Sequence, residues 1–359
     1  MEILKLENLC EIKTGKKDVN QGNPEGKYPF FTCALEHTYS DTFSYDTEAL
    51  MIAGNGAVGN VTYYSGKFEA YQRTYILADF NKKINVKYLN HFLQGMLKDI
   101  LKKKVLGSTM PYIKVSFLKN IEIPVPSLQE QEEIVERLDK FFESIKNKVD
   151  KESKSIELYG KLYKSKLSQI FNNEFMGSGE TELGKLSEII SGQSPKGEFI
   201  NDSEGLEFHQ GKKAFSDKFL LDSGKRTQYT TKQIPKNTIV MSVRAPVGPV
   251  NITQESICIG RGLAGIIPKE SNLDFLFYYL DSIKEENTGH IGATINSINR
   301  NEIMKIKIPN VSIAKQETIA NQIEQILELK NELVSNSREV LTKLNKLKKS
   351  ILRKEFSYE

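Results

Sequence analysis

The chain has 359 residues, 39% of them hydrophobic and 27% charged, and its formal net charge is +4. That length and composition are typical of a folded protein with two or more globular units. A membrane protein is excluded because no apolar run approaches the roughly 18 residues of a membrane span. The first residues, MEILKLENLC, lack the features of a secretion signal, so we expect a cytoplasmic location. The small excess of basic residues leaves nucleic-acid binding open.

The use of cysteine and histidine argues against a disulfide framework and against a metal site. The cysteines are isolated and odd in number: Cys10, Cys33 and Cys258. No histidine lies near a cysteine or another histidine at the spacing of zinc ligands: His37, His91, His209 and His290. We therefore expect no bound metal.

The chain repeats itself, beginning with its first element. LENLCEIKTG, which starts at Leu6, returns as LGKLSEIISG at Leu183, an offset of 177 residues. A longer match pairs GSTMPYIKVSFLKNIEIPVPSLQEQEEI from Gly107 with GATINSINRNEIMKIKIPNVSIAKQETI from Gly292, at an offset of 185. Because the offset changes along the chain, loops of different length must join equivalent elements. The sequence therefore predicts a tandem duplication whose halves share one fold.

Another match lies in the middle of each half. LMIAGNGAVGNV parallels VMSVRAPVGPV, which pairs Gly59 with Gly248 and brings Arg73 close to Arg261. The first copy, from Gly54 to Gly59, also fits the dinucleotide-binding pattern G-x-G-x-x-G. However, the following NVTYYSGKF alternates like a strand and does not open a helix, and the second copy keeps only the last glycine. We therefore interpret this motif as a tight turn or hairpin.

The globular part of each half mixes strand-like and helical runs; we call these parts head 1 (residues 1–126) and head 2 (residues 178–310). The strand-like runs cover residues 50–53, 239–243 and 264–267. The helical runs cover residues 86–101 and 273–283. This mixture predicts two compact heads of the α/β or α+β class.

A long helical tail follows each head, over residues 127–177 and 311–359. The first tail begins with a capping box, in which Ser127 and Glu130 bond each other's backbone N–H groups. The second tail begins at Ser312 without the matching glutamate. A polar linker, MGSGETE, separates the first tail from head 2.

Both tails show the heptad spacing of coiled coils. The first carries Ile134, Leu138, Phe141, Ile145, Val149, Ile156, Tyr159, Tyr163, Leu167 and Ile170. The second carries Ile319, Ile323, Ile326, Lys330, Leu333, Ser337, Val340, Leu344, Leu347 and Ile351. Both end in I-x-x-x-E-F, and the first has four additional residues, which predicts a stutter near Val149. The alternative is two amphipathic helices, each packed on its own head.

The sequence carries no conspicuous catalytic constellation, so we expect no catalytic residue. The Asn/Asp-Pro-Pro-aromatic loop of amino-methyltransferases is absent, and so is the phosphate-binding pattern G-x-x-x-x-G-K-[ST]. Glu182 and Lys185 have a spacing found in nucleases, but they lie in the linker region.

A duplicated chain with two heads and two capped coiled-coil tails resembles the specificity (S) subunit of type I restriction-modification systems, the HsdS family. The resemblance rests on LENLCEIKTG, on GSTMPYIKVSFLKNIEIPVPSLQEQEEIVERLD and on their second copies, above all IPNVSIAKQETIANQIEQIL. It covers essentially the whole chain. The second copy departs from the family pattern where GATINS lacks a proline and where Ala314 and Lys315 replace an acidic pair.

The resemblance implies two target recognition domains, each of which reads one half of a split DNA site. The two tails would pair antiparallel and act as a spacer between them. Two methyltransferase (M) subunits would dock on the helices and carry S-adenosylmethionine, and motor-nuclease (R) subunits would join for restriction. The chain itself would bind no cofactor and perform no catalysis.

Polar side chains in predicted loops are the candidate DNA contacts, because Arg and Lys suit guanine and phosphate while Asn and Gln suit adenine. In head 1 they are Lys16, Lys17, Asn55, Gln72 and Arg73. In head 2 they are Gln193, His209, Gln210, Lys212, Lys213, Arg244 and Arg261. Two other functions stay open: a methyltransferase or nuclease with an unrecognised site, and a scaffold whose heads bind protein.

Overall fold

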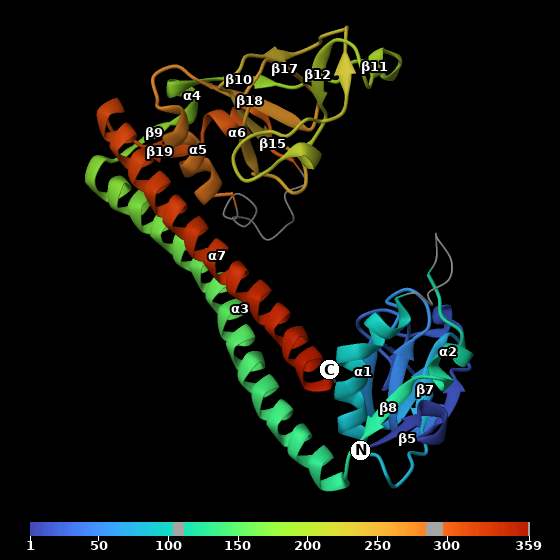
Figure 1. Cartoon of the computed structure of the whole chain (residues 1–359). Coiled ribbons are helices and arrows are strands. Elements are labelled where there is room, and N and C mark those ends of the chain that lie inside the picture. Colours follow the sequence, from blue (N-terminus) through green and yellow to red (C-terminus); the bar gives the residue numbers. More distant parts are fainter. Residues whose placement is uncertain (103–110, 285–296, 358–359) are drawn as a thin grey trace. The chain divides into compact units, whose positions relative to one another are not determined.

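The computed structural model describes three stretches of the chain: residues 1–102, 111–284 and 297–357. Contacts divide the chain into unit 1 (Met1–Ser153 with Arg338–Glu359) and unit 2 (Lys154–Ser337). Each unit contains one head and a stretch of each of two long helices (Figure 1). Among the described residues, no helix is both long enough and apolar enough to cross a membrane.

Head 1 is built on a six-stranded sheet with the order β2-β7-β5-β6-β3-β4. Its strands are β2 (Glu11–Thr14), β3 (Tyr28–Phe31), β4 (Thr38–Ser40), β5 (Tyr45–Ala53), β6 (Val61–Ala70) and β7 (Thr74–Ala78). Neighbours are antiparallel except β3 and β6, which are parallel. The head also contains β1 (Glu2–Lys5) paired with β8 (Glu122–Val125), the helices α1 (Val86–Leu101) and α2 (Val115–Lys119), and the 3-10 turns η1 (Leu6–Asn8) and η2 (Val19–Gln21).

The main core of head 1 lies between this sheet and α1. The sequence of α1 places apolar residues four apart, Leu89, Leu93 and Leu97, and all three are buried, as expected for an amphipathic helix. The side chain of Asn85 caps the helix by accepting hydrogen bonds from two backbone N–H groups of its first turn. Leu50 of β5 belongs to the same buried cluster. The core therefore includes strands at whose ends the candidate residues of head 1 lie.

Head 2 has two sheets, with the orders β10-β18-β15-β16 and β11-β13-β12-β17-β14. The first contains β10 (Ser187–Ser191), β15 (Ile239–Ser242), β16 (Val250–Ile252) and β18 (Leu263–Pro268). The second contains β11 (Ile200–Asn201), β12 (Leu206–His209), β13 (Arg226–Thr227), β14 (Gln233–Ile234) and β17 (Ile257–Ile259). The remaining elements are β9 (Glu180–Glu182) paired with β19 (Lys307–Pro309), α4 (Leu183–Leu186), α5 (Leu273–Ser282), α6 (Arg300–Met304), η3 (Gly197–Phe199) and η4 (Lys212–Ala214).

The two heads share a strand order, which confirms the predicted duplication and the mixed α/β class. β2-β7-β5-β6 in head 1 corresponds to β10-β18-β15-β16 in head 2, and all these pairs are antiparallel. The parallel pair recurs as well, as β3 with β6 and as β12 with β17. Residues 107–110 and 292–296, which open the longest sequence match, lie outside the described residues, as does His290.

Both long helices begin where the sequence predicts: α3 is Leu128–Ser178 and α7 is Ile313–Phe356. The N–H of Ser127 donates to the carboxylate of Glu130 at 2.9 Å, and the N–H of Glu130 donates to Ser127 Oγ at 3.3 Å, which confirms the capping box. At the start of α7, the N–H of Lys315 donates to Ser312 Oγ at 3.4 Å without a returning carboxylate. α3 continues as one helix through Val149, where we predicted four additional residues.

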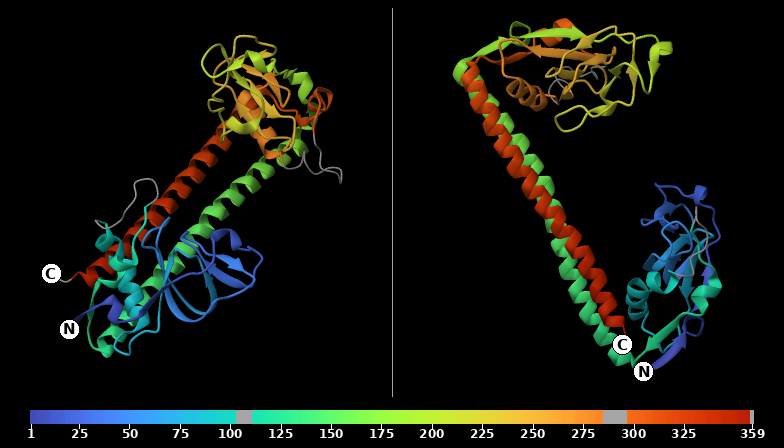
Figure 2. Two further views of the ribbon diagram at one scale, coloured as in Figure 1. Left: turned by 90° about the vertical axis from the view of Figure 1, so that its right-hand side faces the viewer. Right: turned by 45° about the horizontal axis from the view of Figure 1, so that its top comes forward.

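Within each unit, the stretches of α3 and α7 lie side by side and run in opposite directions (Figure 2). In unit 1, Arg137 early in α3 forms an ion pair with Glu355 at the end of α7. In unit 2, Glu174 near the end of α3 lies 3.3 Å from the ammonium of Lys315 at the start of α7. Because early residues of one helix meet late residues of the other, the pair is antiparallel, as the resemblance implies.

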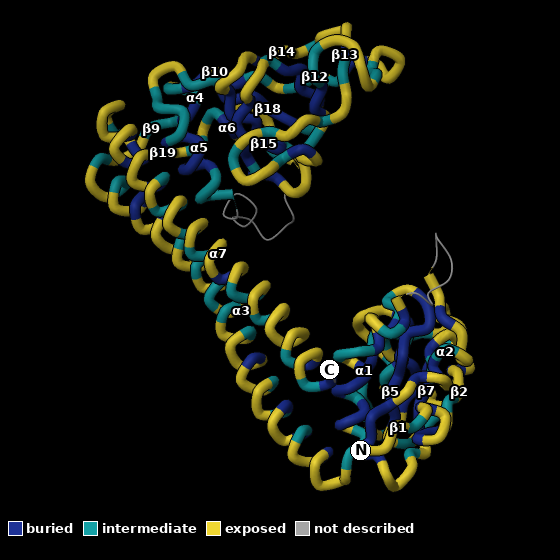
Figure 3. The backbone as a smooth tube through the Cα atoms, viewed as in Figure 1, coloured by how far each residue is buried: buried dark blue, intermediate teal, exposed yellow. Residues whose placement is uncertain are grey.

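Burial along the two helices supports a coiled-coil seam (Figure 3). Leu138 and Leu167 of α3 and Ile323 of α7 are buried at predicted seam positions. Two seam predictions are wrong, because Phe141 and Leu347 are 37% and 43% exposed. The two helices therefore bury several of the predicted heptad positions but leave Phe141 and Leu347 exposed.

The alternative in which each tail packs only on its own head is wrong. Phe356, at the end of α7, packs against Tyr88 and Phe92 of α1, with ring centroids 5.5 and 5.4 Å apart. Phe175, near the end of α3, packs against Tyr279 of α5 at 5.8 Å. The shared I-x-x-x-E-F ends thus dock each helix on the head of the other repeat.

Candidate functional site

Backbone hydrogen bonds identify equivalent positions in the two heads. The N–H of Gly15 donates to the first residue of β7 at 3.1 Å, and the N–H of Gly192 donates to the first residue of β18 at 2.9 Å. The next residues, Lys16 and Gln193, donate to the last residue of β6 and of β17 respectively. These two candidate contacts therefore occupy the same place in the fold.

A second pair of candidates is also equivalent. Asn55 forms an isolated antiparallel bridge with Tyr112, and Arg244 forms the same bridge with Ser297. Both residues follow the central strand of their sheet, β5 or β15, by two positions. Asn55 is 8% exposed, and Arg244 lies on the surface. The fold thus places a buried amide in head 1 where it places an exposed guanidinium in head 2.

The glycine motif forms a turn, as predicted, and not a phosphate-binding loop. Gly59 and Gly248 donate their N–H groups to the last residues of β5 and β15, at 2.9 and 3.0 Å. Their φ angles are 72° and 106°, which glycine adopts without strain. In head 1 the strand β6 follows the turn, and not the helix that a dinucleotide site requires.

The structure gives the residue-by-residue correspondence near Arg73 and Arg261, which the sequence match brings close together. Arg73 directly precedes β7, whereas Gly262 directly precedes β18. Since β7 and β18 begin at equivalent positions, Gln72 and not Arg73 corresponds to Arg261. The predicted proximity of Arg73 and Arg261 is confirmed, because the two residues differ by one position in this correspondence.

Four candidates of head 2 line one surface hollow of about 260 Å³. Its lining consists of Gln210, Gly211, Lys212, Ser242, Arg244, Ala245, Arg261 and Gly262. They come from three separate segments, after β12, after β15 and before β18. The lining residues include three cationic side chains and no acidic one. The hollow therefore favours an anionic or acceptor-rich ligand.

The arginines of this hollow differ from the other arginines of head 2. Arg226 forms an ion pair with Asp222 at 2.7 Å, and Arg300 donates to the carbonyl of Ile189 at 2.9 Å. Within the described residues, the guanidinium groups of Arg244 and Arg261 have no hydrogen-bond or ion-pair partner. Their donors are therefore available to an external acceptor.

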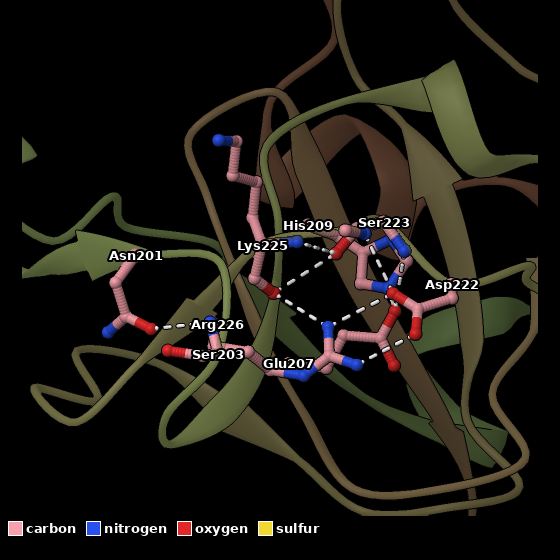
Figure 4. A network of polar contacts seen from close by, with 9 residues as sticks. Asn201, Ser203, Glu207, His209, Asp222, Ser223, Lys225 and Arg226 are labelled. Carbon is pink, nitrogen blue, oxygen red and sulfur yellow. Dashed lines mark hydrogen bonds and ion pairs between the residues drawn. The ribbon is translucent and has the colours of Figure 1, made fainter.

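His209, in contrast, lies inside head 2 and is only 2% exposed. Its Nε2 lies 2.8 Å from a carboxylate oxygen of Glu207, which also accepts the N–H of Ser223 at 2.8 Å (Figure 4). The neighbouring pair of Asp222 and Arg226 completes this network. Burial lowers the pKa of His209 and outweighs the opposite effect of Glu207. The imidazole therefore supports the head and is not presented at its surface.

The candidates of head 1 are also unequally available. The ammonium of Lys17 donates to Ser40 and Thr42 at 2.9 and 2.6 Å, and lies 3.6 Å from the buried carboxylate of Glu69. Lys17 is therefore engaged within the head.

Three further candidates of head 1 lie on the surface. Gln72 donates to Asp18 at 3.2 Å, and the ammonium of Lys16 lies 5.8 Å from the ring centroid of Tyr45. Arg73 is exposed, and its guanidinium has no hydrogen bond or ion pair with the described residues. Arg73 is thus the head 1 candidate most open to an external acceptor.

In head 2, Gln193, Gln210, Lys212 and Lys213 are exposed. None of these four side chains has a hydrogen bond or ion pair with the described residues, although the backbone of Gln193 is held by Ile259 and by the hydroxyl of Thr231. Lys213 lies beside the hollow in η4 but does not line it.

Two buried glutamines tie the heads to the helices, although the sequence did not single them out. Gln131 of α3 accepts the N–H of Asn85 at 2.7 Å and donates to two backbone carbonyls at 2.9 Å. Gln316 of α7 accepts the N–H of Asn272 at 2.8 Å. Both bonds reach the residue that caps the head helix, α1 or α5. Their identity at the offset of 185 residues was the available signal.

Each head helix also meets the long helices through polar groups. In unit 1, His91 Nε2 lies 2.8 Å from Asp139 Oδ1. In unit 2, the ammonium of Lys218 donates to Tyr278 and Glu324 at 3.1 and 3.2 Å. In the part of the chain that the structure describes, no cluster of three or more His, Cys, Asp or Glu side chains could hold a metal.

Comparison with known proteins places these features in one family. A family model described as the type I restriction modification DNA specificity domain matches residues 1–158 and 177–343. A putative type I restriction enzyme MjaX specificity subunit of Methanocaldococcus jannaschii is 33% identical over 82% of this chain and 73% of its own length. The type I restriction enzyme EcoDI specificity subunit of Escherichia coli is 26% identical over 99% and 88% of the two chains.

A solved structure shares the fold. It comes from a study of complex assembly and conformational transition of the type I restriction-modification system, and its chain is 22% identical to this one. The match covers 98% of this chain and 96% of that chain, with a TM-score of 0.75.

Proposed function

Because the chain belongs to the family of type I restriction-modification DNA specificity proteins, we propose that its two heads read the two halves of a split site on duplex DNA. Head 1 (residues 1–126) would bind one half and head 2 (residues 178–310) the other. The observation that carries this proposal is the hollow of head 2, where the guanidinium groups of Arg244 and Arg261 have no partner among the described residues and no acidic residue lines the wall. The duplicated strand order supports a second reader in head 1.

The candidate residues fall into two groups, those that suit phosphate contacts and those that suit base contacts. Lysines on the rim, such as Lys212 and Lys213, suit the phosphate backbone, which fixes position without reading sequence. Arginine and amide side chains that reach the major groove distinguish base pairs by their donors and acceptors. A head that carries both kinds can bind any duplex weakly and its own half-site tightly.

The two long helices would set the distance between the half-sites and dock two M subunits. Their support is the antiparallel pairing within each unit and the exchange of helix ends between the repeats. A stiff connection of two readers fixes half-site spacing, as dimer geometry does in other DNA-binding proteins. The M subunits would carry S-adenosylmethionine, R subunits would join for restriction, and the assembly would act in the cytoplasm.

We propose that the chain performs no catalysis itself. The supporting observation is the sequence, which lacks the methyltransferase loop and the phosphate-binding motif. Reconstitution tests this proposal: full-length chain, cognate M subunit and labelled S-adenosylmethionine are combined with duplex DNA, and each protein is also assayed alone. We expect methyl transfer at specific sites only when both proteins are present.

Each other outcome identifies a different function. Methyl transfer or cleavage by the chain alone would contradict a non-catalytic role and favour an enzyme with an unrecognised site. Failure of the chain and the M subunit together to select any DNA sequence would favour a protein-binding scaffold.

A further inference from the structure

The two heads carry different base-reading chemistry at equivalent backbone positions. Arg244 in head 2 corresponds to Asn55 in head 1, because both form the same isolated bridge after the central strand. Arg261 in head 2 corresponds to Gln72 in head 1, because both lie two residues before the equivalent strands β18 and β7. One head therefore has two guanidinium groups where the other has two amides.

We infer that Arg244 and Arg261 each read a guanine, and that the half-site of head 1 is read by amides at the equivalent places and favours adenine there. This inference rests on the proposed function. A guanidinium offers parallel donors that match the O6 and N7 acceptors of guanine. An Asn or Gln amide offers one donor and one acceptor, which match N7 and N6 of adenine.

The backbone at both arginines is anchored, although their guanidinium groups have no partner among the described residues. The N–H of Arg261 donates to Ser194 Oγ at 3.3 Å. The carbonyl of Arg244 accepts the hydroxyl of Ser242 at 3.1 Å, and its bridge to Ser297 adds a second restraint. Fixed Cα positions lower the conformational entropy that is lost when the arginines bind DNA. Because no described residue accepts from the guanidinium groups, DNA acceptors do not compete with a protein acceptor.

The surroundings also favour base contact by the two arginines. Both line the same hollow together with Gln210 and Lys212, so a ligand that fills the hollow can contact both arginines. In head 1, Asn55 has no side-chain hydrogen bond to the described residues, whereas Gln72 is held by Asp18. Asn55 is only 8% exposed, however, whereas Gln72 lies on the surface, so Gln72 is the primary adenine reader that we assign to head 1.

Selection from a DNA pool tests the inference. Full-length chain with its cognate M subunit is incubated with duplexes in which two random blocks are separated by spacers of several lengths, and bound duplexes are sequenced. For the natural chain we expect guanine at one or two fixed positions of one block. The double variant Arg244→Asn with Arg261→Gln places the side chains of head 1 in head 2. It should lose that guanine preference and bind the natural site roughly 5- to 150-fold more weakly for each arginine.

Two control variants separate base reading from general charge. Arg338→Gln removes an exposed arginine of α7 whose guanidinium has no hydrogen bond or ion pair with the described residues, and it should leave the selected sequence unchanged. Lys212→Gln with Lys213→Gln should weaken binding to all duplexes alike, because phosphate contacts carry no sequence information.

The outcomes distinguish this inference from the proposed function. If the arginine variant loses affinity equally for every duplex, both arginines bind phosphate and the inference is overturned. The same holds if the natural chain selects a split site whose blocks contain no fixed guanine. If the natural chain selects no sequence at all, the proposed function itself fails.

Discussion

Each head helix contacts a long helix through a polar junction, and the two junctions differ in their polar groups. In unit 1, His91 of α1 bonds Asp139 of α3. In unit 2, Tyr278 of α5 and Glu324 of α7 both accept a hydrogen bond from the ammonium of Lys218. These places correspond because each lies six residues after the capping asparagine of its head helix and eight residues after the buried glutamine of its long helix. The two head-to-helix junctions therefore use equivalent positions but place different polar groups at them.

The two junctions share their glutamine contacts to the backbone and their aromatic packing. Gln131 and Gln316 reach the capping asparagine in both units, and an aromatic ring from the other helix's end covers each head helix. The charged groups are the part that differs. We conclude that the glutamine and the aromatic ring fix the geometry of a junction, whereas its ionic groups can be exchanged.

The difference also places a histidine in only one of the two junctions. Burial lowers the pKa of His91, although the bond and charge of Asp139 oppose this effect. Lys87 of α1 and Lys348 of α7 also face His91 and lower its pKa further. In unit 2, burial alone would lower the pKa of Lys218, but hydrogen bonds to Tyr278 and Asp274 raise it overall.

The largest effect should come from removing the aromatic ends. Phe356→Ala deletes a ring that is 2% exposed and packs on two rings of α1, so it should destabilise unit 1 by about 3–5 kcal/mol. Phe175→Ala deletes a ring that is only half-buried and should cost less in unit 2. Amide hydrogen exchange of the full chain, followed in peptides of α1 and α5, measures each loss locally. Equal losses in both helices would contradict the ranking.

A smaller effect should come from the cation of unit 2. Lys218→Met keeps the apolar stem but leaves the carboxylates of Asp274 and Glu324 without their shared cation. Since these carboxylates are 41% and 44% exposed, we expect a loss of about 1–3 kcal/mol, below that of a fully buried pair. Lys225→Met, which removes an exposed pair with Asp202, is the matched control and should cost under about 0.5 kcal/mol. Similar losses in the two variants would show that the ionic cluster does not stabilise this junction.

The smallest effect should be the pH dependence of unit 1. The unfolded chain takes up a proton on His91 near pH 6.5, whereas the folded state resists it, so acidification to about pH 5.5 should weaken unit 1 by up to about 1 kcal/mol. His91→Gln can still bond Asp139 but does not titrate, and should remove this loss. Exchange rates of α1 peptides at pH 7.5 and 5.5, corrected for intrinsic exchange, provide the measurement.

His209 supplies an internal comparison for that experiment. Its pKa is also lowered by burial, so head 2 should retain its own acid sensitivity in the His91→Gln variant. If α1 peptides of the variant respond to pH as the natural chain does, His91 is not the titrating group.

Much of the architecture could be predicted from the sequence because it rests on periodic patterns. The repeat at an offset of 185 residues, the capping box at Ser127 and the heptads of both tails all have counterparts in the structure. Exposure of Phe141 and Leu347 could not be predicted, because a heptad selects a helix face but does not say which partner covers each position.

The candidate contacts were harder to predict than the fold. A sequence shows that Lys17 and His209 are polar, but only the fold shows that Glu69 and Glu207 already engage them. The convergence of Arg244 and Arg261 on one hollow also depends on loops far apart in the chain. Local sequence therefore predicts which side chains could bind DNA, and tertiary structure decides which ones are free to do so.

The measurement that tests the central claim most directly is the exchange of one head. Residues 1–126 are replaced by the corresponding head of a family member with a different DNA site, and the hybrid is combined with the M subunit. Methylated sites are then sequenced. If each head reads its own half-site, one half of the methylated sequence changes, while the other half and the spacing stay as in the natural chain. A change in both halves, or in neither, would contradict the account.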